Sequence, residues 1–253
     1  MSESILPPSS FISRGLNATQ LRIIALVAMT LDHLWATIVP GNMWMHCVGR
    51  IAFPLFAFQL TEGAAHTLDM SAYIRRLLVF ALISEIPYNL IRSGSPIFPM
   101  SQNVMFSLLL GLLGINEVQA IRNSATTGSR IGHSLRLALW AFLSLIGFVD
   151  YGILGFSLIL LIHFFKGPGV KRGLLLAAFL LVNQFLYKGS GFPVILLGQE
   201  FVIRHQAFAI LALIPISLYN GEKGNGYRAI QRLSYLYYPM HCAVIYGIWL
   251  LLP

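Results

Sequence analysis

The chain has 253 residues, of which 57% are hydrophobic and only 10% are charged, and its mean hydropathy is +0.73. Soluble domains carry about 25% charged residues, so this composition excludes an ordinary soluble protein and predicts an integral membrane protein. Lys and Arg outnumber Asp and Glu by 17 to 9. Because basic loops orient membrane proteins, the excess predicts the lipid bilayer as a partner and not a nucleic acid.

Residues 1–20 are predicted to be a short cytoplasmic tail, because they hold prolines and serines but no apolar signal-peptide core. Residues 21–253 are predicted to be a single integral-membrane domain, without a repeat or long linker. The first apolar stretch, 21–39, is long enough to cross a bilayer and carries Asp32 and His33 near its middle. An acid at that depth costs about 2.5 to 3.5 kcal/mol. We therefore expect the pair to face the interior of a helix bundle.

Apolar segments recur along the whole chain and predict an all-α, polytopic bundle of about nine transmembrane helices. The predicted spans are residues 21–39, 43–60, 73–91, 103–118, 135–148, 152–165, 174–187, 206–219 and 235–252. Residues 192–203 are a disputed tenth span, and the polar connection 122–136 is expected to be mobile.

The distribution of Arg and Lys sets the orientation. With the N-terminus in the cytoplasm, nine spans place thirteen of these residues on the inner side and three on the outer side, and Arg50 falls within a span. This is a clear positive-inside pattern. A tenth span would move Lys223, Arg228 and Arg232 outside, so nine spans with the C-terminus outside are preferred.

Further polar residues are predicted at the depth of Asp32 and His33, in the outer half of the membrane. They are Arg50, Glu85, Asn89, Asn103 and the turn residues Asp150 and Tyr151. Unpaired, Asp32, Arg50 and Glu85 would together cost roughly 8 to 10 kcal/mol, so they must meet partners or water. Spacing leaves open whether Arg50 pairs with Asp32 or with Glu85. It also leaves open whether the group is a salt-bridge network that holds helices together or a reaction site.

A second polar group is predicted at the inner face. It comprises Glu62, His66, Arg75 and Arg76 near one loop, and Lys223, Arg228 and Arg232 before the last span. Arg suits phosphate because its planar fork donates two hydrogen bonds at once. The group would therefore suit a phosphate-bearing cytoplasmic ligand, although orientation of the chain and anionic lipid also explain basic loops.

The last predicted span carries several aromatic side chains, with Tyr238 and His241 on either side of Pro239 and Met240. A proline inside a span frees a backbone carbonyl, so polar groups can bond there. His241 is either a second site histidine or a packed, hydrogen-bonded one. Cys47 and Cys242 lack metal-ligand spacing, so packing roles and no metal are expected. The histidines near span ends are assigned to the interface: His46, His133, His163 and His205.

Several short motifs occur together in a fixed order along the chain. They are Met29-Thr30-Leu31-Asp32-His33, Gly49-Arg50-Ile51-Ala52-Phe53-Pro54, Glu62-Gly63 with His66-Thr67, Tyr73-Ile74-Arg75-Arg76-Leu77, Ser84-Glu85-Ile86-Pro87-Tyr88-Asn89, Asn103-Val104-Met105-Phe106, Tyr151-Gly152, Leu218-Tyr219-Asn220-Gly221 and Tyr237-Tyr238-Pro239-Met240-His241. In this order and spacing they resemble the TraX family over nearly the whole chain. The resemblance implies a multi-pass protein of the bacterial inner membrane that transfers an acetyl group from acetyl-CoA. It implies the N-terminus of a conjugative pilin, or a cell-surface glycan, as the acceptor.

The resemblance makes His33 the best match for the catalytic histidine, and the residues around it take roles in one hypothesis. His33 would act as general base or carry the acyl group, Asp32 would organise Arg50, and Arg50 would stabilise the oxyanion. The remaining predicted catalytic residues are Glu85, Asn89 and Asn103. The predicted acyl-CoA-binding residues are Glu62, His66, Arg75, Arg76, Arg228, Arg232, Tyr238 and His241.

Two other function classes remain open from the sequence. In a proton-coupled transporter, Asp32, His33 and Glu85 would form an intramembrane relay, but no repeat typical of many transporters is detectable. A non-catalytic assembly factor for a pilus would tolerate substitution of His33 and Arg50.

Overall fold

The computed structural model describes residues 15–165, 167, 169–187 and 189–252, so most of the predicted cytoplasmic tail lies outside the described residues. The chain is mostly helical, as predicted. Its elements are α1 (Ala18–Thr37), α2 (Met43–Gly49), α3 (Ala52–His66), α4 (Met70–Ser93), α5 (Val104–Asn123), α6 (Thr127–Ile146), α7 (Gly152–Phe165), α8 (Val170–Leu180), the π-helix η1 (Leu181–Leu186), β1 (Gly191–Leu196), β2 (Gln199–Arg204), the 3-10 helix η2 (His205–Ala212), α9 (Leu213–Ser217) and α10 (Tyr227–Leu251).

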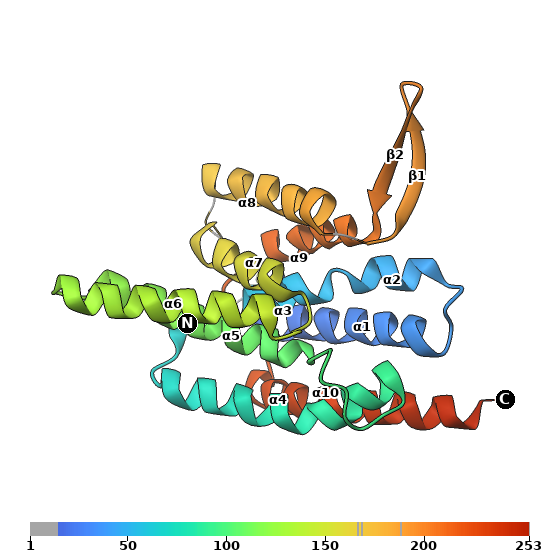
Figure 1. Cartoon of the computed structure of the whole chain (residues 1–253), viewed down its shortest axis with the longest axis horizontal. Coiled ribbons are helices and arrows are strands. Elements are labelled where there is room, and N and C mark those ends of the chain that lie inside the picture. The colour runs from blue at the N-terminus through green and yellow to red at the C-terminus, as the bar shows by residue number, and fades with distance from the viewer. Residues whose placement is uncertain (1–14, 166, 168, 188, 253) are drawn as a thin grey trace, which may run out of the picture.

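The helices lie side by side along one common direction (Figure 1). α1 packs against α2, α3 and α10, α4 packs against α5 and α10, and α5 packs against α6 and α7. At one end, which we call the inner end, the Leu16 N–H donates to the Leu218 carbonyl at 2.7 Å. At the opposite, outer end, Gln102 forms a bridge with Val149. Successive segments therefore alternate in direction between two defined ends.

α1 begins with a capping box. The Asn17 side chain accepts from the Gln20 backbone N–H at 3.0 Å, and the Gln20 side chain accepts from the Asn17 N–H at 2.9 Å. Two backbone donors that a helix start leaves free are thereby satisfied. This fixed start determines which side chains of α1 face its neighbours, including Asp32 and His33.

The predicted span 43–60 is two helices, because the α-helical ladder breaks between α2 and α3. Pro54 lies in the first turn of α3 and has no N–H to donate to the carbonyl of Arg50. Arg50 therefore lies at a break between helices. The connection 122–136, predicted to be mobile, is largely the start of α6, whose Thr126 cap accepts from the Ser129 N–H.

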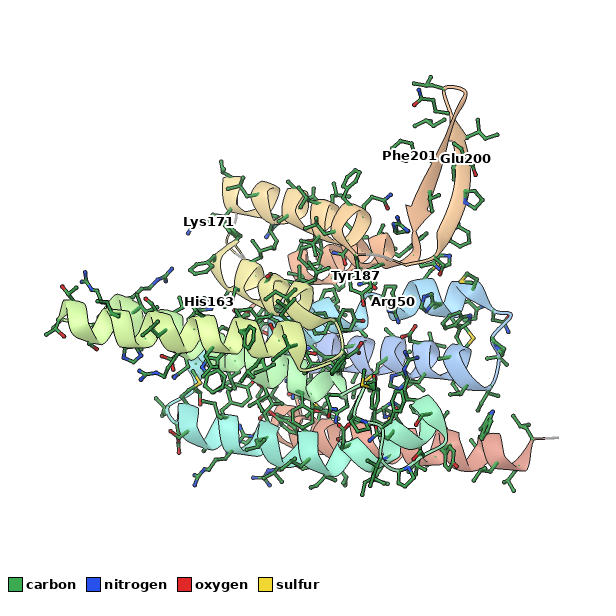
Figure 2. All side chains as sticks on the ribbon, viewed as in Figure 1. Arg50, His163, Lys171, Tyr187, Glu200 and Phe201 are labelled. Carbon is green, nitrogen blue, oxygen red and sulfur yellow. The ribbon has the colours of Figure 1, made fainter. Side chains whose placement is uncertain are left out.

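The disputed tenth span, 192–203, is not a helix. Its residues form an antiparallel β-hairpin with Phe192 opposite Ile203, and the hairpin stands out from the bundle (Figures 1 and 2). The tight turn uses Leu197 and Gly198, which both have positive φ, as a two-residue type I′ turn requires. Glu200 and Phe201 follow the turn at the far end of the hairpin (Figure 2).

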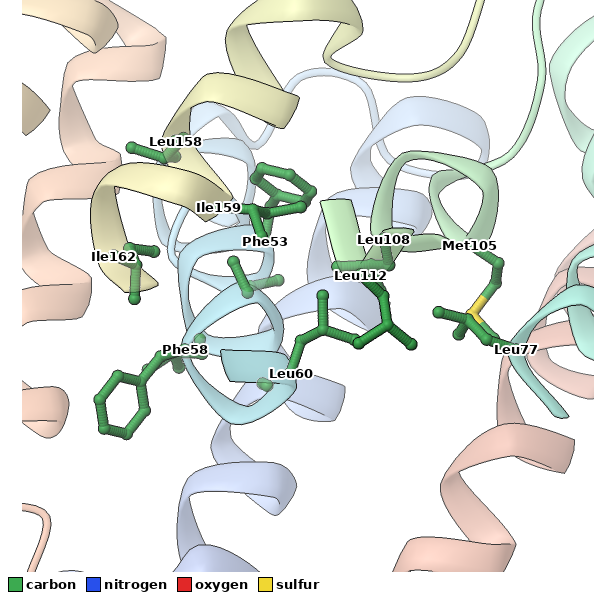
Figure 3. Close-up of a cluster of buried hydrophobic side chains, with 14 of the residues drawn as sticks. Phe53, Phe58, Leu60, Leu77, Met105, Leu108, Leu112, Leu158, Ile159 and Ile162 are labelled. Carbon is green, nitrogen blue, oxygen red and sulfur yellow. The ribbon is translucent and has the colours of Figure 1, made fainter. Parts of the chain in front are cut away.

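The apolar core lies where α3 is enclosed by α1, α5 and α7 (Figure 3). Leu55 of α3, Leu112 of α5 and Ile159 of α7 are fully buried. The helices of this core approach closely at Gly111, where an added Cβ would lie 2.4 Å from Ile159. α3 is therefore the central helix, and its position fixes the residues at its two ends.

The exterior of the bundle is also apolar. Among the described residues, α5 is the one helix that is both long and apolar enough to cross a membrane by length and composition, which is weak support on its own. However, α4, α6 and α10 each expose a row of large apolar side chains. They are Leu78, Val79, Leu82, Ile83 and Ile86 on α4, Leu135, Leu139, Phe142, Leu145 and Ile146 on α6, and Leu233, Leu236, Met240, Val244 and Ile248 on α10. Exposed apolar patches spread over several helices are rare on soluble monomers.

Candidate functional site

Asp32 of α1 is held by two side chains from the α2 segment. Its Oδ1 accepts from His46 Nδ1 at 2.8 Å, and its Oδ2 is ion-paired with Arg50. The two helices approach closely because residue 49 is glycine, where a Cβ would lie 2.4 Å from the Asp32 Cβ. Arg50 therefore pairs with Asp32 and not with Glu85.

Arg50 is also hydrogen-bonded to Gln206, which is itself hydrogen-bonded to Asn183. Its Nη1 donates to Gln206 Oε1 at 3.3 Å, and Gln206 Nε2 in turn donates to Asn183 Oδ1 at 3.1 Å. Among the residues that the structure describes, the buried Arg50 Nε has no hydrogen-bond partner. The guanidinium is thus held from two sides, and its Nε–H is left for another acceptor.

His33 forms a hydrogen-bonded pair with His241 of α10, with 2.7 Å between His33 Nδ1 and His241 Nε2. The two ring planes differ by 5° and their centroids are 4.9 Å apart, so the bond lies close to the plane of both rings. His241 Nδ1 is 2.9 Å from the Tyr237 carbonyl oxygen. Since a carbonyl only accepts, Nδ1 of His241 carries the proton and its Nε2 accepts from His33.

A cavity of about 330 Å³ at the outer end, which we call the outer cavity, brings these groups together. It is roomy enough for water or a small ligand group. Its polar and aromatic lining residues are Asp32, His33, Trp35, Thr37, His46, Arg50, Phe53, Phe56, Tyr88, Arg92, Ser101, Asp150 and Tyr151.

Asp150 lies in the turn between α6 and α7, outside the helices. Burial raises the pKa of its carboxyl to about 6, although the Arg50 guanidinium acts in the opposite direction. The Asp150 Oδ1 accepts from the Tyr151 N–H at 3.1 Å. The turn therefore adds a second carboxyl group to the wall of the outer cavity.

Three predicted catalytic residues are not among those that line the outer cavity. The Asn103 amide donates to Glu85 Oε2 at 2.6 Å, and its oxygen caps α5 by accepting from the Met105 N–H at 3.0 Å. Asn89 donates to the Pro96 carbonyl at 3.3 Å. Both predicted catalytic amides therefore have hydrogen-bond partners in this structure, outside the outer cavity. These amides join α4 to the chain that enters α5.

A second cavity, of about 260 Å³, opens at the inner end, and we call it the inner cavity. Of the residues predicted to bind a cofactor, Glu62 and His66 line it, together with Lys223 and Arg22. Their charges are mixed, with two permanent cations and one acid.

The remaining basic residues of the inner group do not line this cavity. Arg75, Arg228 and Arg232 are exposed. Arg76 is also exposed, and its guanidinium lies 5.3 Å from the ring centroid of Tyr73, close enough for a cation–π contact. The predicted basic group is therefore divided between the cavity wall and the surrounding surface.

A third, narrow cavity of about 70 Å³ lies between the other two, and we call it the middle cavity. It shares Arg22 and Gln59 with the inner cavity, and Met29, Phe56 and Val104 with the outer cavity. The three cavities therefore form a line through the bundle. The middle cavity is otherwise lined mainly by apolar and aromatic residues, including the predicted Tyr238.

Arg22 marks the boundary between the inner and middle cavities. Its Nε donates to Gln59 Oε1 at 2.9 Å and its Nη1 donates to Ser234 Oγ at 3.3 Å. Gln59 is 8% exposed, and its buried Nε2 has no hydrogen-bond partner within the described part of the chain. Arg22, Gln59 and Ser234 form what we call the polar collar, and the NH2 group of Gln59 is its unused donor group.

Sequence reasoning missed some residues of the site. His46 was assigned to the membrane interface, but it lines the outer cavity and contacts Asp32. Its position four residues before Arg50 was the available signal, because such residues share a helix face. Arg22 is one of the thirteen Arg and Lys residues that the sequence places on the inner side, with no further role predicted. Nothing in the local pattern marks Gln59 or Gln206.

The structure thus defines a class of helical protein, in which two histidines and an acid–guanidinium pair from separate helices meet beside a cavity. That cavity shares lining residues with a middle cavity, which in turn shares residues with the cavity at the opposite end. The family model described as "TraX protein" matches residues 17–249. The chain belongs to the TraX family.

Two curated proteins are similar to the chain. "Probable fimbrial assembly protein FimC, serogroup H1" from Dichelobacter nodosus is 29% identical over 245 residues, which covers 90% of this chain and 94% of that protein. "Protein TraX" from Escherichia coli (strain K12) is 30% identical over 148 residues, which covers 56% of this chain and 54% of that protein. No solved structure gives a significant match.

Proposed function

We propose that the protein is a multi-pass acyltransferase of a bacterial inner membrane. It would move an acetyl or other acyl group from cytoplasmic acyl-CoA to an amine or hydroxyl acceptor at the outer side. The acceptor would be the N-terminus of a pilin or a cell-surface glycan. The observation that carries this proposal is the line of three cavities from the inner end to His33. A donor on one side and an acceptor on the other need such a passage.

The membrane location is supported by the apolar rows on α4, α6 and α10. A face that exposes Leu82 and Ile83 on α4 and Val244 and Ile248 on α10 is unfavourable in water but suits acyl chains. The alternating direction of the segments and the predicted charge distribution agree with a cytoplasmic inner end. With the inner end in the cytoplasm, the outer cavity would open on the opposite side of the membrane.

The donor would bind from the inner end. The phosphates of acyl-CoA would lie near Lys223 and Arg22, with the exposed arginines around them. The thin amide-bearing arm would pass the collar, where the Gln59 amide has a donor left for it. The middle cavity is narrow and would accommodate the arm but not a nucleotide, so the thioester alone would reach the outer cavity.

The reaction would use His33 as the general base. Because its Nδ1–H donates to His241, its Nε2 keeps the lone pair needed to take a proton from the acceptor amine or hydroxyl. The acceptor would attack the thioester carbonyl, and Arg50 would stabilise the negative oxygen of the tetrahedral intermediate. When the carbon–sulfur bond breaks, the CoA thiolate would receive the proton back from His33. His241 is then a positioning residue, and Asp32 holds Arg50.

The test is acyl transfer by the full-length chain. His33→Ala should abolish transfer of labelled acetyl from acetyl-CoA to surface proteins and glycans, detected by mass spectrometry of cells with and without the gene. The matched control is His163→Ala, because His163 lies on α7 away from Arg50 (Figure 2). Full transfer by His33→Ala, with normal amounts of folded protein, would eliminate the proposal.

The two other function classes give different results in the same experiment. A proton relay through Glu85 is less well supported, because that side chain bonds Asn103 and does not line the outer cavity. A non-catalytic factor in fimbrial assembly, as the name of the Dichelobacter nodosus relative suggests for that protein, would keep its function in His33→Ala.

A further inference from the structure

One side chain beside the histidine pair has no role in the proposed reaction. Cys242 follows His241 on α10 and is fully buried. Its Sγ lies 4.0 Å from His33 Nδ1 and 3.8 Å from His241 Nε2, and these two nitrogens are 2.7 Å apart. Three potential metal ligands, two imidazole nitrogens and one sulfur, therefore converge on one point.

The distances suit a soft divalent ion. Zinc binds histidine nitrogen at about 2.0 to 2.1 Å and cysteine sulfur at about 2.3 Å, so ligand atoms around a tetrahedral ion lie roughly 3.3 to 3.6 Å apart. The two nitrogen–sulfur separations exceed that spacing by a few tenths of an ångström. The nitrogen–nitrogen separation must widen by roughly 0.6 Å, and the rings of His33 and His241 must turn so that both lone pairs point at the ion instead of along the line between the nitrogens.

The surroundings of the cluster also suit a metal. Ligating histidines usually donate their second N–H to a carbonyl or carboxylate, which fixes the tautomer. His241 donates Nδ1–H to the Tyr237 carbonyl in this way, so its Nε2 already presents a lone pair. His33 lines the outer cavity, which supplies an entry path and space for a fourth ligand.

We infer that His33, His241 and Cys242 bind a thiophilic cation of the zinc type, and that binding switches off the proposed acyl transfer. On binding, the Cys242 thiol releases its proton to solvent and the thiolate becomes a ligand. The His33 proton moves from Nδ1 to Nε2, so that Nδ1 can bind the ion. Nε2 then has no lone pair for the acceptor. The inhibitory part of this inference rests on the proposed function, whereas the binding part does not.

Sequence spacing could not reveal this cluster. His33 and His241 are 208 positions apart, and Cys242 stands next to a histidine without the repeated ligand spacing that marks zinc motifs. The expectation of no metal came from that missing pattern. The packing of α1 against α10 creates the cluster.

Metal binding is tested on the full-length protein in detergent. After incubation with Zn²⁺ and desalting, we expect one zinc per chain by elemental mass spectrometry, and at least a tenfold loss of retained zinc in Cys242→Ala. The matched control is Cys47→Ala, since Cys47 is also a buried free cysteine but is not part of the cluster. No zinc in the wild type, or equal retention in both variants, overturns the inference.

A second measurement uses the wild type, so its result does not depend on whether the Cys242→Ala variant folds. Wild-type protein titrated with Co²⁺ should develop a near-ultraviolet thiolate-to-cobalt absorption band, and a spectrum without that band contradicts the cluster. In the transfer assay, Zn²⁺ should inhibit the wild type and Cys47→Ala, but Cys242→Ala should stay active. Activation by zinc, or loss of activity when zinc is removed, overturns the inhibitory role. A wild type inactive under all conditions contradicts the proposed function and leaves the binding result intact.

Discussion

The outer cavity and the inner cavity differ in how firmly their charges are held. In the outer cavity, Asp32 contacts two partners, and Arg50 is bonded to both Asp32 and Gln206. At the inner end, Lys223 lines the cavity but is exposed, and Arg75 and Arg228 are exposed on the surface outside it. Fixed groups suit a reaction that needs defined geometry, whereas exposed cations suit a hydrated, charged ligand that binds and leaves. Substitutions at the two ends should therefore change different kinetic quantities.

The largest effect is expected from Arg50→Gln. Removing one oxyanion donor typically lowers kcat by 10² to 10³. The variant also removes one of the two partners of the partly buried Asp32, which costs stability. We expect kcat to fall by about 10² to 10³ with a smaller change in KM, measured by initial rates of acyl transfer.

Arg204→Gln is the control, since Arg204 lies at the base of the hairpin and does not line the outer cavity. Equal losses in both variants would contradict the proposed role.

The next effect concerns His241 as a positioning residue. His241→Ala removes the acceptor for His33 Nδ1–H, so we expect kcat to fall about 10- to 100-fold. This is less than the roughly 10²- to 10⁴-fold contributed by general acid–base catalysis itself, because the variant keeps the His33 base. His241→Gln keeps an oxygen that can accept from His33 and should recover part of the activity. A general packing role would make both variants equally poor, and thermal unfolding of each variant reports that directly.

A smaller effect, of a different kind, is expected at the inner end. Lys223→Ala should raise KM for acyl-CoA about threefold to tenfold with nearly unchanged kcat, because it weakens one charge-assisted contact to the donor phosphates. Arg228→Ala should change KM less, since Arg228 does not line the inner cavity. Rates measured against acyl-CoA concentration distinguish the two. A large fall in kcat in Lys223→Ala would contradict the expectation that the inner end affects KM and the outer cavity affects kcat.

Sequence reasoning succeeded where one residue implies a constraint by itself. A buried acid and a buried guanidinium demand partners, which predicted that Asp32 and Arg50 belong together at one depth, and the structure joins them. It failed where the constraint is shared between distant segments. Glu85 has the same cost as Asp32, yet its partner is Asn103 at the start of α5. Hydropathy cannot tell these two outcomes apart.

The fold shows the same limit. Apolar runs predicted the helical segments, because their length and composition are local properties. The hairpin at 191–204 has a similar composition, and only its Leu197-Gly198 turn distinguishes it. The splitting of 43–60 depends on Pro54, which the sequence contains but hydropathy ignores. Turn and proline chemistry therefore carried information that segment hydropathy did not.

The smallest effect concerns Asp150, whose burial sets the cost of placing a second carboxyl group in the outer cavity. Its pKa of about 6 in the folded protein lies above the ordinary value of 3.8. The folded protein therefore holds this proton more tightly than the unfolded chain does, and stability should fall as pH rises from about 4 to about 6. Asp150→Asn removes this dependence. We expect the thermal midpoint of the wild type, relative to the variant, to fall by roughly 5 °C over that interval.

The control for Asp150 is Glu200→Gln, because Glu200 is an exposed acid on the hairpin, far along the chain from the turn. It should follow the wild-type pH dependence. If Asp150→Asn also follows it, the carboxyl is charged in the folded protein throughout this range, held by the Arg50 guanidinium. The outer cavity would then contain two carboxylates around one guanidinium, and Arg50 would be less available to a developing oxyanion. The pH profile of stability thus tests the electrostatic basis of the proposed reaction without an acceptor.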